Sequence, residues 1–412
     1  MRVAIRSLLL SLCAALLAGA AVAQGVGKNI LFYGNSYSSR NGGVGDLVRL
    51  LAIEAGLPAP TIVKRYVSSA DLQYHATNAT QVATITTALP VGQRWDFVVM
   101  QGQSLEATAA SGDPAQFRAS ALQILGNVRN HSPLAKAVLY QTWARAVGHF
   151  LYPATFATPR AMHDEIRGNY LAARNDLVAA YGAGAAIHAG VGDGVALLGW
   201  QPSYYDPDLF HPLPPMTLLA GMCLFTSIYN LRVCPLSPNL AGAGALATWL
   251  AGLGITQADW DQMAGLADLC AARSVRPFPG SSDYLTLESG VAPGNVSACG
   301  ARNVGIGSLL TLQMRSRNGV FDNAPGLLLV NVFPVGAPPL PSPTWPELRI
   351  DVGSMLVLLQ APTLQQPLGL ALPLPFSFPG AAVLAQGIAF APSSATGNPS
   401  FVTTEGCVLV FQ

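Results

Sequence analysis

The chain has 412 residues, of which 51% are hydrophobic and 10% charged, and its net charge is +1. This composition excludes a disordered protein, and the length favours two domains over one small core. The sequence holds no basic cluster, which argues against a nucleic-acid partner.

Residues 1–23 have the pattern of a secretory signal peptide. Arg2 and Arg6 form its basic start, and residues 8–17 form its apolar centre. The small residues Ala21-Val22-Ala23 then suit a cleavage site. We therefore expect a secreted protein that resides in the periplasm, on the cell surface or outside the cell.

The sequence does not favour either a lipid anchor or a membrane span. Lipidation of Cys13 is disfavoured, because Leu12 stands where a small residue normally precedes a lipidated cysteine. Beyond residue 24 no apolar run approaches the ~20 residues that a spanning helix needs. No membrane span is expected once the signal is removed.

From residue 28 to about 275, short apolar runs alternate with segments of helical periodicity. The runs expected to be strands are 29–33, 61–66, 97–101, 137–141 and 185–188. The segments expected to be helices are 44–55, 114–130, 159–181, 216–229 and 245–272, the last as one helix or two. This alternation predicts an α/β domain over residues 24–275, with three α/β/α layers around a parallel sheet.

The pattern changes at about residue 277, where helical periodicity ends and glycine and proline become frequent. Short β-rich runs follow, at 284–287, 309–314, 326–332, 348–352, 382–389 and 407–411. Turn pairs such as Pro325-Gly326 separate them. Residues 276–412 are therefore expected to form an all-β sandwich, whose role the sequence does not indicate.

Five cysteines follow the signal segment, and export permits disulfides. We expect the pairs Cys234–Cys270 and Cys299–Cys407, because each pair stays within one expected domain. Cys223 lies in an apolar helical segment, which indicates a buried free thiol. The chain has no Cys-x-x-Cys pair, so neither a structural zinc site nor another metal is expected.

Two short segments together carry the groups that covalent acyl transfer requires. Gly34-Asn35-Ser36 follows the first apolar run and places a hydroxyl at the carboxyl end of a strand, where active sites of parallel sheets gather. Asp208-Leu209-Phe210-His211 supplies an imidazole and, three residues before it, a carboxylate to orient it. The combination predicts a hydrolase with a Ser-His-Asp triad.

Each of these residues also has another interpretation. Ser36 suits a helix N-cap, and His211 suits a loop histidine beside prolines. Asp206 and Asp193 compete with Asp208 as the partner of His211. Asp206-Pro207-Asp208 presents two carboxylates close together, and Asp193 is expected in a loop after a strand. The spacing of the Asp-x-x-His segment favours Asp208.

Residues 30–38 resemble the first block of the SGNH (GDSL-type) hydrolase superfamily, in its Gly-Asn-Ser form, and Asp208 and His211 match its Asp-x-x-His block. The resemblance covers roughly residues 28–275 and is that of a divergent secreted bacterial member. It implies a three-layer α/β/α fold and ester hydrolysis, with Ser36 as nucleophile, His211 as base and Asp208 as its orienting partner. The chain has no Gly-x-Ser-x-Gly motif, so the α/β-hydrolase elbow is not expected.

The two middle blocks depart from the family's pattern. The second block normally offers a glycine N–H to the oxyanion, whereas this chain has Val67-Ser68-Ser69-Ala70, with Ser69 as our candidate. The third block normally supplies an asparagine, whereas here a strand runs into Gln101-Gly102-Gln103-Ser104. The amide of Gln101 or Gln103 is a candidate donor, and Ser104 stands where the asparagine aligns. Gln101 is equally well explained as a strand-end residue bonded to backbone.

Trp143 and Arg145 follow another strand and are candidates to line the substrate cleft. A tryptophan face suits a sugar ring and an arginine suits a carboxylate, although core packing explains Trp143 equally well. The remaining histidines show no metal-ligand spacing, and His163-Asp164-Glu165 indicates an exposed helix face.

These observations predict a secreted serine esterase that acts on small acyl esters, without a cofactor. O-acetyl groups of an acetylated polysaccharide are the first choice of substrate. This choice follows from the substrates usual for the family that the sequence resembles and from the additional β domain. The alternative is a catalytically inactive protein of the same fold that serves as a surface or carbohydrate-binding protein. The altered second and third blocks favour this alternative.

Overall fold

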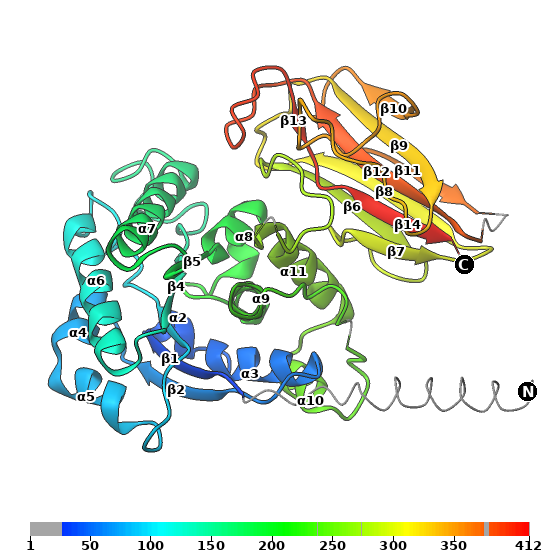
Figure 1. Ribbon diagram of the computed structural model, residues 1–412. Helices are drawn as coiled ribbons and strands as arrows, with labels where there is room; N and C mark the ends of the chain where they lie inside the picture. Colours follow the sequence, from blue (N-terminus) through cyan, green and yellow to red (C-terminus); the bar gives the residue numbers. More distant parts are fainter. Residues whose placement is uncertain (1–26, 237, 273, 375–378, 412) are drawn as a thin grey trace, which may run out of the picture.

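A computed structural model describes residues 27–236, 238–272, 274–374 and 379–411 (Figure 1). The expected signal peptide, residues 1–23 with Cys13, lies outside the described residues. Within them, no helix is long and apolar enough to cross a membrane.

Five parallel strands form the sheet that positions the candidate site. They are β1 (Asn29–Gly34), β2 (Thr61–Tyr66), β3 (Phe97–Met100), β4 (Lys136–Tyr140) and β5 (Ala186–Ala189), in the order β2-β1-β3-β4-β5. β1 and β3 are buried along their whole length, as the continuous apolar runs of a parallel sheet covered on both faces should be. The strand order reverses between β1 and β3, and ligands of such sheets bind beside this reversal at the carboxyl ends. Ser36 directly follows β1 and therefore lies at that position.

Helices cover both faces of this sheet (Figure 1). One face carries α3 (Val44–Glu54), α8 (Val191–Leu197), α9 (Pro214–Tyr229), α10 (Ala245–Gly252) and α11 (Gln257–Cys270). The other carries α4 (Leu72–Thr77), α5 (Ala79–Thr87), α6 (Pro114–His131) and α7 (Pro159–Tyr181), while α2 (Ser36–Ser39) and the 3-10 helix η1 (Pro202–Tyr204) lie in connections. α6 and α7 each begin at a proline, and the preceding Asp113 and Thr158 accept hydrogen bonds from the first-turn N–H groups. The three-layer α/β/α fold is confirmed.

The remaining strands form two further sheets, which face each other. They are β6 (Leu285–Val291), β7 (Ala301–Val304), β8 (Leu309–Ser316), β9 (Gly326–Pro334), β10 (Leu356–Ala361), β11 (Leu368–Pro373), β12 (Ala381–Ala389), β13 (Val402–Thr403) and β14 (Cys407–Phe411). One sheet has the order β10-β9-β12-β14-β7, with β13 beside β12, and the other has the order β11-β8-β6. Leu287 and Met314 from the smaller sheet pack in one core with Leu328 and Leu409 from the larger. The expected all-β sandwich is confirmed.

One expected strand, at residues 348–352, is wrong. Leu348 and Ile350 are buried there, so the alternation that suggested a strand is real. Its backbone, however, bonds to side chains: Arg349 N donates to Gln386 Oε1, and Asp351 N donates to Asn331 Oδ1. The segment therefore contacts β9 and β12 through their side chains without joining the sheet, and the next strand along the chain is β10.

The expected disulfide pairs are also wrong. The structure joins Cys234, which follows α9, to Cys299, which precedes β7, with a Cα–Cα distance of 5.9 Å. The expectation failed because it confined each pair to one domain, whereas this bridge links the α/β domain to the β-sandwich. Cys223, Cys270 and Cys407 are free thiols, and Cys223 is buried as expected.

The disulfide should stabilise the protein measurably. The bridge closes a loop with a sequence separation of 65, so it restricts the unfolded chain. Replacing both Cys234 and Cys299 with serine should lower the free energy of unfolding by about 2–4 kcal/mol. Denaturant unfolding with and without a reductant measures the loss, and the reductant should have no further effect on the double variant. A double variant as stable as the parent would contradict this role.

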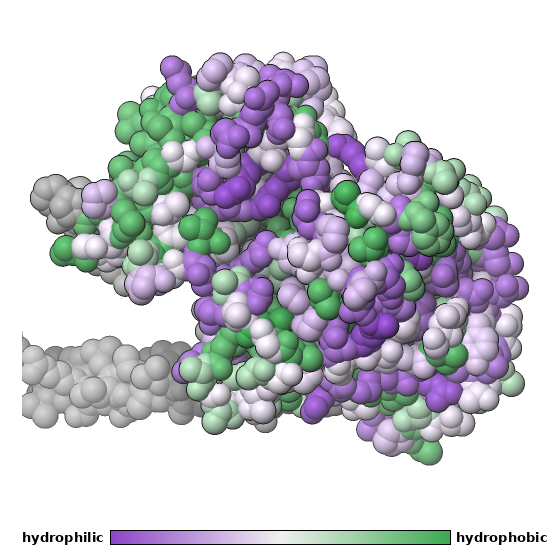
Figure 2. Space-filling model, turned by 180° about the vertical axis from the view of Figure 1, so that it is seen from behind, coloured by the Kyte–Doolittle hydropathy of each residue, from purple (hydrophilic) through white to green (hydrophobic). Residues whose placement is uncertain are grey.

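The hydropathy of the surface differs between the outer part of the β-sandwich and the region where the two domains meet. Figure 2 shows hydrophilic residues gathered between the β-sandwich and the α/β domain, and hydrophobic residues on the outer part of the sandwich. Exposed apolar side chains of the sandwich include Val332 on β9 and Leu356 and Val357 on β10. The region between the domains is therefore the more polar one.

Candidate active site

Ser36 begins the short helix α2, immediately beyond the carboxyl end of β1. Asn35 is the N-cap of this helix, because its Oδ1 accepts a hydrogen bond of 3.1 Å from Tyr37 N. Asn35 Nδ2 donates to Ala70 O at 3.0 Å and so joins this turn to the loop after β2. The capping role considered for Ser36 belongs to Asn35, which leaves the Ser36 hydroxyl for other partners.

The three side chains expected to form a triad lie together. Ser36 Oγ is 2.8 Å from His211 Nε2, and His211 Nδ1 is 2.6 Å from Asp208 Oδ2. Asp208 Oδ1 accepts hydrogen bonds from the backbone N–H groups of Phe210 and His211, at 3.0 and 2.9 Å. An ionised carboxylate at this place accepts the proton on Nδ1, which leaves Nε2 free to accept from the serine.

The electrostatics of Asp208 keep it ionised. Partial burial raises its pKa, but the hydrogen bonds from the backbone and ring of His211 and from Phe210 N outweigh burial. The pKa of Asp208 therefore lies below its usual value, and the carboxylate is charged at neutral pH.

A tight turn positions His211 beside Asp208. Asp206 N donates to His211 O at 2.9 Å, and Leu209 N donates to Asp206 O at 2.8 Å. Leu209 has φ +62°, a left-handed conformation that leucine rarely adopts. Trp143 Nε1 donates to Phe210 O at 3.1 Å, which ties the turn to the segment after β4.

The other two aspartates considered as partners of His211 are engaged elsewhere. Asp206 forms an ion pair with Arg40. Asp193 lies on α8, where its Oδ1 is 3.1 Å from Arg167 Nε. The geometry assigns the partner position to Asp208.

Gln101 is buried beneath the turn that carries Ser36. It is 0% exposed. Its Oε1 accepts from Asn35 N at 3.0 Å and from Ser38 Oγ at 2.8 Å, while its Nε2 donates to Asn35 Oδ1 at 3.0 Å. Both amide atoms are therefore occupied, and the expectation that Gln101 donates to an oxyanion is not met. Its place fits the alternative, a strand-end residue bonded to its neighbours, and Gln101 holds the turn that carries Ser36.

Removing the Gln101 amide should lower turnover by displacing Ser36. Gln101→Ala frees the N–H of Asn35 and the hydroxyl of Ser38, and a displacement of about 1 Å at a reacting group costs about 10²-fold. We expect this loss in kcat, with a smaller change in KM. Gln93→Ala, at an exposed glutamine, is the matched control. An unchanged kcat in a folded Gln101→Ala protein would contradict the positioning role.

Backbone N–H groups are the available donors for an oxyanion. Ser69 is exposed and lies in a turn closed by the hydrogen bond from Ala70 N to Val67 O, at 3.1 Å. Its φ of +58° is in the left-handed region that favours glycine, so Ser69 adopts the backbone that the family's glycine would supply. The N–H groups of Ser36 and Ser69 have no acceptor among the residues that the structure describes.

Gln103 and Ser104 shape the loop after β3. Gln103 Oε1 accepts from Leu105 N at 2.7 Å, and its Nε2 donates to Ser104 Oγ at 3.3 Å. Ser104 is buried and also accepts from Arg145 Nη2 at 2.8 Å. Both side chains are thus committed within the protein, which does not support the oxyanion role expected for them.

Trp143 and Arg145 do not line a cleft as expected. Trp143 is 0% exposed and stacks on Tyr37 with ring centroids 4.4 Å apart. Arg145, 5% exposed, bonds to the Tyr37 hydroxyl and lies over the Phe210 ring at 4.5 Å. Core packing, the alternative for Trp143, is what the structure has, and both residues support the neighbours of Ser36 and His211.

Two buried residues near the site were missed from the sequence. Glu106 accepts from Leu72 N at 3.0 Å and from Gln103 N at 2.8 Å, so it ties the loop after β2 to the loop after β3, and burial raises its pKa to about 7. His75 Nε2 bonds to Gly34 O at 3.1 Å, and burial lowers its pKa to about 4, so it is a neutral donor. Glu106 is the first acidic residue after the third strand, and neither it nor His75 has a sequence pattern that marks it as part of the site.

Within the described residues, no group of three or more histidine, cysteine, aspartate or glutamate side chains is arranged to hold a metal ion.

No protein-family model matches this sequence, and no curated protein sequence matches it either. Solved structures that resemble the chain include a protein from Slackia heliotrinireducens that is provisionally described as an SGNH hydrolase. The match has 21% identity and a TM-score of 0.39, and it covers 49% of this chain and 99% of that one. A DUF4886 family protein from Bacteroides uniformis has 14% identity, coverage of 56% and 97%, and a TM-score of 0.39. Axe2, an acetylxylan esterase from Geobacillus stearothermophilus, has 14% identity, coverage of 50% and 95%, and a TM-score of 0.36. SGNH-type structures are thus among those that this chain resembles.

Proposed function

We propose that this protein is a serine hydrolase that cleaves carboxylic esters through Ser36, His211 and Asp208. The observation that carries the proposal is the hydrogen bond of 2.8 Å between Ser36 Oγ and His211 Nε2. It stands beside the bond of 2.6 Å that orients His211 from the opposite ring nitrogen. A serine hydroxyl is a weak nucleophile by itself. It becomes reactive when a histidine accepts its proton and a carboxylate orients that histidine, as these two bonds allow.

The reaction follows from these positions. His211 Nε2 takes the Ser36 proton as Oγ attacks the ester carbonyl, and Asp208 stabilises the imidazolium that forms. The N–H groups of Ser36 and Ser69 donate to the oxyanion of the tetrahedral intermediate. His211 then gives the proton to the departing alcohol, which leaves an acyl group on Ser36. Water, deprotonated by the same imidazole, releases the acid and restores the serine.

For the substrate we propose a small acyl ester, with O-acetyl groups of an acetylated polysaccharide as the first choice. This choice follows the sequence resemblance and not a side chain of the site. We also propose that the protein is exported. The disulfide between Cys234 and Cys299 supports export, because such bonds persist in oxidising compartments.

A fluorophosphonate probe tests the proposal directly. Such a probe phosphonylates a serine whose hydroxyl is activated by a base, so peptide mass spectrometry should find the adduct on Ser36. Labelling should disappear in His211→Ala and persist in Ser39→Ala, which changes an exposed serine of the same short helix. A folded protein that takes up no probe would favour the alternative, a non-catalytic surface or carbohydrate-binding protein.

A further inference from the structure

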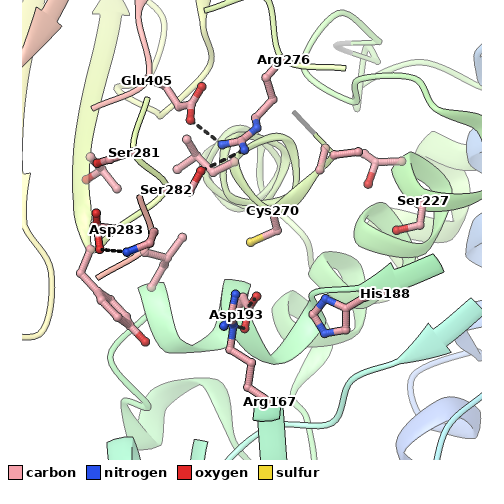
Figure 3. A pocket seen from close by; sticks show the side chains of 18 of the residues that line it. Arg167, His188, Asp193, Ser227, Cys270, Arg276, Ser281, Ser282, Asp283 and Glu405 are labelled. Carbon is pink, nitrogen blue, oxygen red and sulfur yellow. Dashed lines mark hydrogen bonds and ion pairs between the residues drawn. The ribbon is translucent and has the colours of Figure 1, made fainter. Parts of the chain in front are cut away.

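A cavity of about 870 Å³ lies between the α/β domain and the β-sandwich. Figure 3 shows Arg167, Asp193 and His188 on one side of it and Arg276 and Glu405 on the other. The volume falls within the range of about 300–1,000 Å³ that is usual for ligand pockets. The three triad residues are not among its lining residues, so this cavity is separate from the candidate active site.

The charged groups that line the cavity balance one another. Its lining contains four cationic side chains, Lys136, Arg160, Arg167 and Arg276, and four anionic ones, Asp164, Asp193, Asp283 and Glu405. Arg167 Nε is 3.1 Å from Asp193 Oδ1, and Arg276 Nη1 is 2.5 Å from Glu405 Oε1. Asp283 accepts from Ser394 Oγ at 2.9 Å. A charged ligand would meet a wall without net charge, in which Arg167, Arg276 and Asp283 already have partners.

Buried polar atoms in the same wall lack partners. His163 Nδ1, His188 Nε2 and Arg276 Nε are buried and have no hydrogen-bond partner among the described residues. Arg276 uses its two other nitrogens on Glu405 and Ser282, which leaves the Nε–H free. Buried polar groups are normally satisfied, so three unpaired ones beside a single cavity indicate a missing partner.

The two histidines that line the cavity have neutral imidazoles. Burial lowers the pKa of His163 and lowers that of His188 to about 4. His163 is 1% exposed, so the exposed helix face expected at residues 163–165 is wrong at this position. A neutral imidazole carries one donor and one acceptor nitrogen. Together with the Arg276 Nε–H, the unpaired atoms therefore offer both hydrogen-bonding functions.

We propose that this cavity is a binding site for an uncharged, hydroxyl-rich ligand, namely a neutral oligosaccharide segment. Each sugar hydroxyl can both donate and accept a hydrogen bond. It can therefore pair with the neutral imidazoles, the guanidinium N–H groups and the carboxylates of this wall. Tyr284 adds a partly exposed ring, and Arg160 lies 4.8 Å from that ring. The site does not depend on ester hydrolysis, because it shares no residue with the triad.

Cys270 provides a direct readout of occupancy. It lines the cavity and is partly exposed, whereas the free thiols Cys223 and Cys407 are buried. Iodoacetamide should therefore alkylate Cys270 first in the native protein. In Ser36→Ala protein, xylohexaose, cellohexaose or mannohexaose should slow this alkylation about tenfold at ten times its Kd. Calorimetric titration of the same sugar gives its Kd without thiol chemistry.

Matched variants decide between this site and binding elsewhere. His188→Leu should weaken binding by about tenfold, as expected for one lost hydrogen bond. The same sugar concentration should then slow the alkylation of Cys270 only about twofold. His131→Leu, at a half-buried histidine outside the cavity, should leave the sugar affinity and the protection of Cys270 unchanged.

The proposal is overturned if none of the three sugars binds, or if binding is equal in the His188→Leu protein. It is also overturned if hexagalacturonate, which carries a charge on each unit, binds more tightly than the neutral sugars. Loss of turnover in Ser36→Ala with sugar binding retained would keep the two proposals distinct.

Discussion

Replacing Ser36 with alanine should abolish ester hydrolysis. The variant removes the oxygen that attacks the carbonyl and leaves His211, Asp208 and the backbone donors in place. Removal of a triad serine lowers kcat by a factor on the order of 10⁶. Release of nitrophenol from p-nitrophenyl acetate, followed at saturating substrate, measures the loss.

Ser39→Ala is the matched control for this experiment. Ser39 belongs to the same short helix but is exposed and makes no contact with His211. Its replacement should leave kcat and the melting temperature unchanged. Activity that survives in purified Ser36→Ala protein would show that another residue is the nucleophile.

Replacing Asp208 with asparagine should lower kcat by about 10⁴-fold. The N–H groups of Phe210 and His211 both point at Asp208 Oδ1, so the amide oxygen of the asparagine will occupy that position. Its NH₂ group must then face His211 Nδ1, which has to accept instead of donate. The imidazole proton moves to Nε2, and Nε2 no longer accepts from Ser36.

Asp206→Asn separates this effect from a general loss of charge near the site. It removes the ion pair with Arg40 but leaves both nitrogens of His211 in their present bonds. Its kcat should stay close to that of the parent protein. If Asp206→Asn costs more turnover than Asp208→Asn, then Asp208 is not the orienting group.

Much of the α/β domain was predictable because its signals are local. Continuous apolar runs indicated β1 to β5, and a proline at the first helical position fixed the start of both α6 and α7. The Asp-x-x-His segment likewise carries its own geometry, since the turn of residues 206–211 holds the carboxylate against the imidazole. The meeting of Ser36 with His211 was the one long-range contact in the site that the sequence blocks implied.

The features that were not predicted depend on contacts between distant residues. Gln101 was expected to face the substrate, but its direction is set by Asn35 and Ser38, more than 60 positions away in the chain. The Cys234–Cys299 bond depends on how two domains dock, which no local pattern contains. β7 was missed because it is short and half of it is Arg302 and Asn303. β10 and β11 were also missed, although their sequences are mostly apolar, and in the structure they are largely exposed.

The bond between Cys234 and Cys299 also means that a protease cannot separate the two halves by cutting the segment that connects them. A nick anywhere between these two positions leaves a second covalent path from one half to the other. The fragments would migrate together on a non-reducing gel and part only when a thiol is added. In an environment rich in peptidases, the β-sandwich would stay covalently attached to the α/β domain after the main chain is cleaved.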